Sequence, residues 1–301
     1  MSPLAPVLIG LTSIRGREGA LVRCLDSLLA QALPRDGRPV ELHLFLSREP
    51  YLLDPGFEEV PEALQRLLRR SRSAPLPLQL HWVANSGPYR KLLPLLERLS
   101  PQQQALDPIL ITADDDTLYP PDWLCRLVDA QERFGCVVGF RGRRLVLEEG
   151  LPAPYRAWIT EDRALLEPSL LTVPTGKDGI CYRLSHLDHR VRDLQTALRI
   201  AGHADDLWFK AHCLLTGTPA VLLHHSLAQE FPELRADGQP VVKGGDLEPL
   251  RSLFLTVNKR GGNDLVLERC LAYLGECSGE AVPTALFCDS GAPGPAAGAS
   301  W

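Results

Sequence analysis

Three consecutive carboxylates, Asp114, Asp115 and Asp116, directly follow the apolar run 109–113. Adjacent carboxylates repel one another and have low strand propensity, so folding alone gives no reason for the cluster. At the carboxyl end of a strand in an open α/β sheet they would lie where ligands bind. A divalent cation bridging a diphosphate would offset the repulsion, because Mg²⁺ takes one or two carboxylates together with substrate phosphates. The pattern therefore predicts a metal and diphosphate site, with an acidic surface turn as the alternative.

A second acidic pair, Asp205 and Asp206, opens a helical pattern about ninety residues later. One interpretation is structural, because an N-cap and a first-turn acid together stabilise a helix by about 1 kcal/mol. The other is chemical, because a carboxylate held beside a substrate hydroxyl can act as a general base. The residue types fit both interpretations.

Other polar residues stand at the ends of predicted elements. Arg90 and Lys91 open a helical stretch, where cations are unfavourable unless an anion lies nearby, so we expect phosphate or nucleotide contact rather than solvated charges. Gly176 and Gly179 punctuate a loop and could be turn glycines or a close approach to substrate. His224 ends a short apolar run, where a histidine is more often a structural residue.

These residues are spaced along a regular alternation of elements. Apolar or alternating runs predict strands at 7–11, 40–46, 76–82, 109–113 and 136–140, with amphipathic helical patterns after each of the first four. The third of these helical stretches, 90–99, contains Pro94 and should be kinked or interrupted there. Such alternation predicts an α/β fold: a mostly parallel, Rossmann-like sheet with helices on both faces.

Bulk properties exclude several classes of protein. The 301 residues carry a formal charge of −5 and no long Lys/Arg run, which argues against a nucleic-acid partner. No apolar segment approaches the ~18 residues of a membrane span, and the N-terminus lacks the regions of a signal peptide. We therefore expect a cytoplasmic protein without a transmembrane segment, with peripheral membrane contact left open.

The order of these motifs resembles that of glycosyltransferases of the GT-A fold, of the kind grouped around family 2. The resemblance covers residues 6–225 and rests on motifs in a fixed order. They are Thr12-Ser13 with Arg15, Asn85-Ser86-Gly87 with Arg90-Lys91, the DxD-type Asp114-Asp115-Asp116, the loop 175–179, and Ala204-Asp205-Asp206-Leu207-Trp208-Phe209. A single DxD motif is weak evidence, whereas its place on the fourth strand with a later acidic pair is more specific.

The resemblance implies a role for each position. Asp116 would ligate Mn²⁺ or Mg²⁺ with His224 as a further ligand, and Asp206, with Asp205 as second choice, would be the general base of an inverting reaction. Gly176 and Gly179 would lie on the acceptor side. The nucleotide-sugar pocket would comprise Thr12, Arg15, Asn85, Arg90, Lys91, Asp114 and Asp115.

The resemblance also implies a domain plan and a substrate class. We expect a catalytic domain at 1–225, with a nucleotide-sugar half (1–140) and an acceptor half (141–225), then an extension at 226–288 with one helix and a disordered tail at 289–301. The activity would be a hexosyltransferase-type transfer from a nucleotide-diphosphate sugar, with a UDP-sugar as first candidate, to a glycan or lipid-linked acceptor. One departure concerns the base: the family commonly has an Asp at the end of the second strand, where this chain has Leu46-Ser47-Arg48-Glu49.

Two alternatives remain. A haloacid-dehalogenase-type Mg²⁺-dependent phosphatase also places Asp-x-Asp after an apolar strand, but it prefers that strand near the start of its domain and has Thr or Val two residues after the second Asp, where this chain has Leu118. A catalytically silent GT-A-fold binding protein would have no reason to keep clustered carboxylates that are costly to bury.

Overall fold

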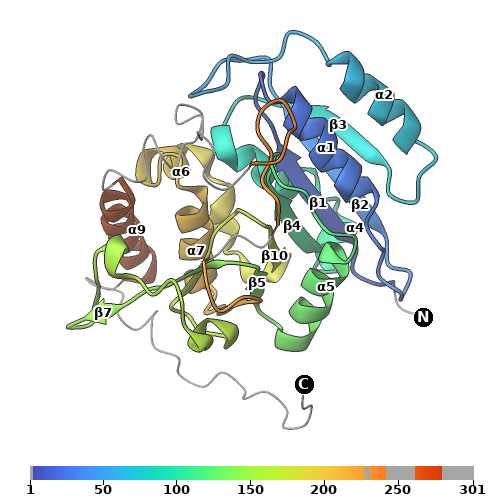
Figure 1. Ribbon diagram of the computed structural model, residues 1–301. Coiled ribbons are helices and arrows are strands. Elements are labelled where there is room, and N and C mark those ends of the chain that lie inside the picture. The colour runs from blue at the N-terminus through green and yellow to red at the C-terminus, as the bar shows by residue number, and fades with distance from the viewer. Residues whose placement is uncertain (1–2, 228–230, 242–261, 280–301) are drawn as a thin grey trace.

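The computed structural model describes residues 3–227, 231–241 and 262–279, and a seven-stranded sheet forms its centre (Figure 1). The strand order is β11-β5-β10-β4-β1-β2-β3, and β10 runs antiparallel to both its neighbours whereas the other pairs are parallel. The strands are β1 (Val7–Thr12), β2 (Val40–Leu46), β3 (Leu78–Trp82), β4 (Ile109–Ala113), β5 (Val137–Gly139), β10 (Ile180–Arg183) and β11 (Ala220–Leu222).

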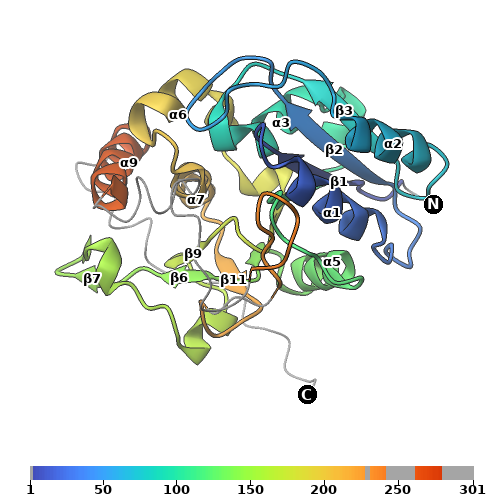
Figure 2. The same ribbon diagram turned by 45° about the horizontal axis from the view of Figure 1, so that its top comes forward.

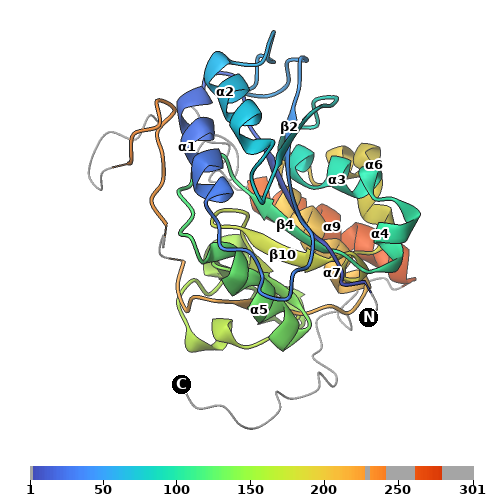
Figure 3. The ribbon, with the colours of Figure 1, turned by 90° about the vertical axis from the view of Figure 1, so that its right-hand side faces the viewer.

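Helices cover both faces of this sheet (Figure 3). On one side lie α1 (Glu18–Leu29), α2 (Glu62–Ser71) and α5 (Trp123–Phe134), and on the other lie α3 (Leu93–Arg98), α4 (Pro101–Ala105), α6 (Leu194–Ile200), α7 (Asp205–Leu215) and α9 (Gly262–Ser278). Side chains alternate along a strand, so Val7 and Ile9 of β1 join the core with α1 while Leu8 joins the core with α3 and α7. The predicted α/β fold with a mostly parallel sheet is confirmed.

Short elements connect these layers. The 3₁₀ helices are η1 (Gly87–Lys91), η2 (Tyr155–Ala157), η3 (Arg163–Leu166), η4 (Leu184–His186) and η5 (His189–Arg192). Two small antiparallel sheets pair β6 (Gly142–Arg144) with β9 (Thr172–Pro174) and β7 (Leu147–Glu148) with β8 (Leu151–Pro152). The expected helix 90–99 is divided at Leu92 into η1 and α3, because Pro94 lacks an N–H and its ring clashes with the carbonyl four residues earlier.

The described part of the C-terminal extension packs against the rest of the chain. Residues 231–241 pass beside α1 (orange in Figure 2), where Ala20 N–H donates to the Ala236 carbonyl at 3.2 Å. The Leu234 N–H donates to the backbone carbonyl of Asp116 at 2.6 Å. The predicted extension helix is α9, whose Leu274 packs in a cluster with Ala211 of α7. The division at residue 225 stays a prediction, and the expected tail 289–301 lies outside the described residues.

Within the described ranges, no helix is both long and apolar enough to span a lipid bilayer.

Candidate active site

A cleft of about 990 Å³ opens over the ends of the central strands and contains most of the predicted site. It is large enough for a nucleotide-sized ligand, because ligand pockets commonly measure ~300–1,000 Å³. The predicted residues that line it are Thr12, Arg90, Lys91, Asp114, Asp115, Asp116, Gly176, Asp205 and Asp206. Arg15, Asn85, Gly179 and His224 are not among the lining residues.

The triple-Asp segment follows β4 and is held by the loop after β1. The Ser13 hydroxyl donates to Asp115, and Arg17 lies 3.1 Å from a carboxylate oxygen of Asp115 and 3.3 Å from one of Asp116. Burial, followed by the neighbouring charge of Asp115, raises the pKa of Asp116 to about 7, although Arg17 acts in the opposite direction. The Asp116 carboxylate therefore lies where a further cation would be favoured.

The donor set around Asp116 suits a cation only in part. Among the described residues, no group of three or more His, Cys, Asp or Glu side chains is arranged to hold a metal ion. Mg²⁺ and Mn²⁺ nevertheless bind through one or two carboxylates when substrate phosphates and water complete the shell. Asp116 fits that arrangement because its side chain is 23% exposed in the cleft.

His224 is not among the described residues that line the cleft. It follows β11, the edge strand, which is three strand spacings or about 14 Å from β4. Its ring meets Phe140 edge-on, with centroids 6.1 Å apart. The metal role of His224 therefore stays a prediction.

Lys91 joins the two acidic motifs. Its ammonium lies 3.4 Å from an oxygen of Asp114 and 3.0 Å from an oxygen of Asp205. Burial opposes the charged form of this lysine, but the carboxylates, Asp114 first, outweigh burial and raise its pKa. The 3₁₀ helix η1 thus places one cation between segments that are about ninety residues apart in the chain.

Asp206 lies at the start of α7 but does not cap it. The N-cap is Ala204, and its side chain forms no capping hydrogen bond. Instead, one oxygen of Asp206 accepts a 2.9 Å hydrogen bond from the Gly176 N–H, and the other, Oδ1, is buried without a partner among the described residues. Burial, followed by the charge of Asp205, raises the pKa of Asp206 to about 7. Burial likewise raises the pKa of Asp205.

Gly176 allows this contact because it has no side chain. A Cβ at this position would lie 2.6 Å from Lys91 Nζ and 3.1 Å from Asp206 Oδ1. Gly179 has another function: its φ is +100°, and a Cβ would lie 2.7 Å from the Trp123 ring. Gly179 therefore shapes the turn under that ring, while Gly176 brings backbone to the carboxylate.

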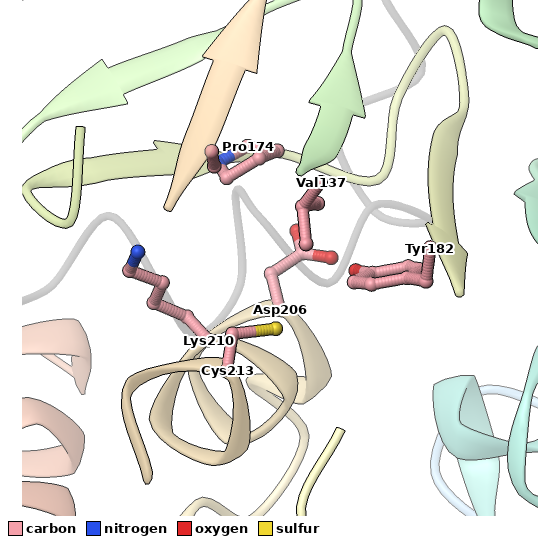
Figure 4. Close-up of a pocket in the computed structure, with 7 residues that line it drawn as sticks. Val137, Pro174, Tyr182, Asp206, Lys210 and Cys213 are labelled. Atoms are coloured by element: carbon pink, nitrogen blue, oxygen red, sulfur yellow. The ribbon is translucent and has the colours of Figure 1, made fainter. Parts of the chain in front are cut away.

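A second, much smaller cavity of about 10 Å³ lies behind Asp206 (Figure 4). Figure 4 shows the Asp206 carboxylate directed toward Val137, with the hydroxyl end of Tyr182 facing it and the Lys210 side chain directed away. The volume is about that of one water molecule. Asp206 therefore borders both this small cavity and the large cleft.

The loop after β2 supplies an acidic residue that the sequence analysis missed. Asp54 is buried; its carboxylate lies 2.9 Å from Arg90 Nη2 and accepts hydrogen bonds from Asn85 Nδ2 at 3.1 Å and the Arg15 N–H at 3.2 Å. The expected position for such an acid was 46–49, whereas the loop returns a carboxylate to this place eight residues after β2 ends. The turn sequence Asp54-Pro55-Gly56 was the available signal, and the Gly56 N–H does bond to Asp54 at 2.9 Å.

Asp54 explains the positions of three predicted nucleotide residues. Arg90 is 1% exposed, and burial lowers its pKa while Asp54 acts in the opposite direction. Asn85 also donates to the Glu49 carbonyl at 2.7 Å, and the Arg15 guanidinium pairs with Glu58 at 2.5 Å. These side chains hold the loops that form the cleft, and their predicted nucleotide contacts stay predictions.

Arg17 and Ser13 were missed for a different reason. Ser13 belongs to the motif Thr12-Ser13 with Arg15, and Arg17 lies two residues after it. Only the folded loop shows that the side chains of Ser13 and Arg17 reach Asp115. The predicted Thr12 lines the cleft, and its hydroxyl donates to the Phe45 carbonyl at 2.7 Å. Sequence adjacency located the loop without identifying which residues contact the acids.

No family model matches this chain, and no curated protein matches it. Several solved structures have similar folds. One is mannosyltransferase PcManGT from Pyrobaculum calidifontis in complex with GDP-Man and Mn²⁺, which is 15% identical to this chain and has a TM-score of 0.46. The match covers 95% of this chain and 78% of that chain. Another is S. aureus TarS 1-349 in complex with UDP, with 14% identity, 74% and 59% coverage, and a TM-score of 0.42. A third is the same protein with UDP-GlcNAc, with 13% identity, 73% and 56% coverage, and a TM-score of 0.39.

This chain therefore spans a little over half of the TarS chain in those structures. The likeness to PcManGT and TarS is one of fold, and their activities and ligands do not follow from it for this chain. A function for this chain therefore has to be inferred from the geometry of its cleft.

Proposed function

We propose that this protein is a metal-dependent, inverting glycosyltransferase that moves a sugar from a nucleotide-diphosphate sugar to a hydroxyl of a glycan or lipid-linked acceptor. One observation carries the proposal: the two acidic motifs of the sequence meet at the ammonium of Lys91, in one cleft. Asp205 is engaged by Lys91 and Asp206 by Gly176, and neither caps α7. A purely structural role for the pair does not account for that arrangement.

Asp206 would act as the general base. A base with a pKa near the working pH transfers protons most effectively, and the pKa of Asp206 is raised to about 7. The Gly176 N–H orients the carboxylate, and Oδ1 has no partner among the described residues and can accept the proton. The acceptor oxygen would attack the anomeric carbon as its proton passes to Asp206 and the bond to the diphosphate oxygen breaks. A single displacement of this kind inverts the anomeric centre.

The triple-Asp segment would hold the donor. Asp116 is the side chain placed to bind Mn²⁺ or Mg²⁺ together with diphosphate oxygens, and such a cation supplies Lewis-acid stabilisation of the leaving group. Arg17 adds a positive charge beside Asp115 and Asp116. Thr12, Asp114 and Asp115 would line the nucleotide-sugar pocket, with a UDP-sugar as the first donor to test.

Thermal unfolding with UDP, GDP, CDP and dTDP, each with and without Mn²⁺, tests the donor site. A ligand at a hundred times its Kd stabilises the folded state by about 2.7 kcal/mol, which raises the Tm by several degrees. We expect a metal-dependent rise with one nucleotide, its loss in Asp116→Ala, and its retention in Asp122→Ala. Asp122 is an exposed acid six residues later whose side chain forms no capping bond, so it is a matched control. A protein that responds to no nucleotide but cleaves a phosphate ester with Mg²⁺ would instead support the phosphatase alternative.

A further inference from the structure

Two arginines of the acceptor half line the cleft from one face of a strand. Arg141 immediately precedes β6 and Arg143 lies within it, and both line the cleft. Residues two apart in a strand point to the same side. Arg144 points to the other side, where its Nη1 donates to the Ala164 carbonyl at 3.1 Å. Two of the three arginines in the segment 141–144 therefore line the cleft, Arg143 from the strand and Arg141 from the position just before it.

These two guanidinium groups are poorly satisfied by the described residues. The Nε atoms of Arg141 and Arg143 are buried and have no hydrogen-bond partner there, and neither group forms an ion pair with a described carboxylate. Burial lowers the pKa of Arg141; the charge of Arg143 adds to this, while Asp178 and Glu233 act in the opposite direction. Nearby Lys177 differs, because it pairs with Glu233 at 2.5 Å. A buried donor without an acceptor is costly, so an anion from outside would stabilise this pair.

An aromatic ring adjoins the arginines. The Arg143 guanidinium lies 4.5 Å from the centroid of the Tyr155 ring, a cation–π contact that orients the group. Tyr155 also lines the cleft, and its N–H donates to Asp264 of α9 at 2.6 Å. The surface thus combines two cations with a ring of the kind that contacts apolar faces of sugars.

Arg141 interacts electrostatically with Asp114 and is also joined through the backbone to the segment that contacts the candidate base. The Arg141 carbonyl accepts a 3.0 Å hydrogen bond from the Thr175 N–H, and the next residue, Gly176, bonds to Asp206. Arg141 follows β5, which is separated from β4 by β10, or about 10 Å across the sheet. A group bound between Arg141 and Arg143 would therefore lie on the side of Asp206 from which an acceptor hydroxyl must approach.

We propose that Arg141 and Arg143 form an anion subsite that selects an acceptor carrying a phosphate or carboxylate group. This rests on the proposed function, because it assigns the acceptor side of the same cleft. The ammonium of Lys177 is neutralised by Glu233, so the selectivity comes from Arg141 and Arg143. A neutral sugar would leave the buried Nε donors of both arginines without a charged acceptor.

Calorimetric binding of glucose 6-phosphate, glucuronate and glucose tests this subsite, with and without saturating UDP and Mn²⁺ to occupy the donor site. We expect the two anionic sugars to bind at least about tenfold more tightly than glucose. Arg141→Gln and Arg143→Gln should each weaken anion binding by about tenfold or more and leave glucose and UDP binding unchanged. Arg143→Lys should recover part of the loss, and Arg156→Gln, the same charge change at an exposed arginine, should have no effect.

Three results would overturn the subsite: equal binding of glucose and the anionic sugars, unchanged anion binding in both glutamine variants, or loss of UDP binding in those variants. The last would assign the arginines to the donor diphosphate. Failure of the transferase proposal would look different. In that case UDP would not bind, while an anion preference that depends on Arg141 and Arg143 could still be measured.

Discussion

The two walls of the cleft differ in how their charges are satisfied. On the wall formed by the segments after β1, β2 and β4, the protein itself pairs these carboxylates: Asp54 with Arg90, and Asp115 and Asp116 with Arg17. On the wall formed by β6, β9 and α7, buried polar atoms such as the Nε of Arg143 and the Oδ1 of Asp206 have no described partner. On the first wall these carboxylates already have cationic partners, although the buried Nη1 of Arg90 has no described partner. On the second wall a carboxylate oxygen is itself without a described partner, so a ligand could complete its bonding. The carboxylate proposed as the general base, Asp206, therefore lies on the second wall, whereas the paired carboxylates that shape the donor side of the cleft lie on the first.

Removing the reactive carboxylate should have the largest effect. Asp206→Asn keeps the shape but cannot accept the hydroxyl proton, so kcat should fall by about 10²–10⁴-fold with little change in the KM for the nucleotide sugar. Steady-state transfer assays measure both constants, and Asp162→Asn, an exposed acid, is the control. A larger kcat loss in Asp205→Asn than in Asp206→Asn would move the base to Asp205.

Substitutions on the first wall should change the free energy of unfolding rather than the rate of the reaction. Arg90→Met leaves the buried Asp54 carboxylate without its cation, which should lower the free energy of unfolding by about 3–5 kcal/mol. Arg66→Met removes an exposed pair with Glu62, for which about 0–1 kcal/mol is expected. Urea unfolding compares the two variants. Similar losses in both would show that the Asp54–Arg90 pair is no more important than a surface pair, and the contrast between the walls would weaken.

Sequence reasoning predicted the elements of the fold better than the contacts of the site. The strand at 40–46 was predicted with its observed bounds, because a continuous apolar run between turns depends on local pattern alone. The two acidic motifs were predicted to share a site, and the structure does place them in one cleft. Local patterns can predict that two motifs share a site when both follow strands or precede helices at the same edge of the sheet.

The features that the sequence did not predict depend on contacts between residues that are far apart in the chain, which local sequence patterns do not reveal. Asp54 reaches the cleft only because its loop folds back beside Ser47, where the Phe57 N–H bonds to the Ser47 carbonyl at 2.8 Å. Arg141 and Arg143 become a pair through strand register with β9. The metal role of His224 was implied by the family resemblance and stays a prediction, and strand order shows only that the strand before it is an edge strand. Register and strand order are properties of the folded chain.

The smallest expected effect is a pH dependence that moves activity and stability in opposite directions. The pKa of Asp206 rises from 3.8 to about 7, chiefly through burial and then Asp205, while Lys91 and the Gly176 N–H oppose the shift and Asp114 adds to it. The base works when deprotonated, so kcat/KM should rise about tenfold per pH unit below 7 and then level off.

The stability follows from the same raised pKa with the opposite sign. A folded-state pKa above the unfolded value means that the folded protein binds the proton more tightly. The stabilisation linked to Asp206 is therefore fully present below about pH 4 and is lost as the pH rises through 7. Asp206→Asn should remove this part of the decline in Tm between pH 5 and 8, whereas Asp162→Asn should keep it. An identical decline in Asp206→Asn and the wild type would mean that Asp206 is ionised across this range, and the wall that holds it would then be as fully satisfied as the wall that holds Asp54.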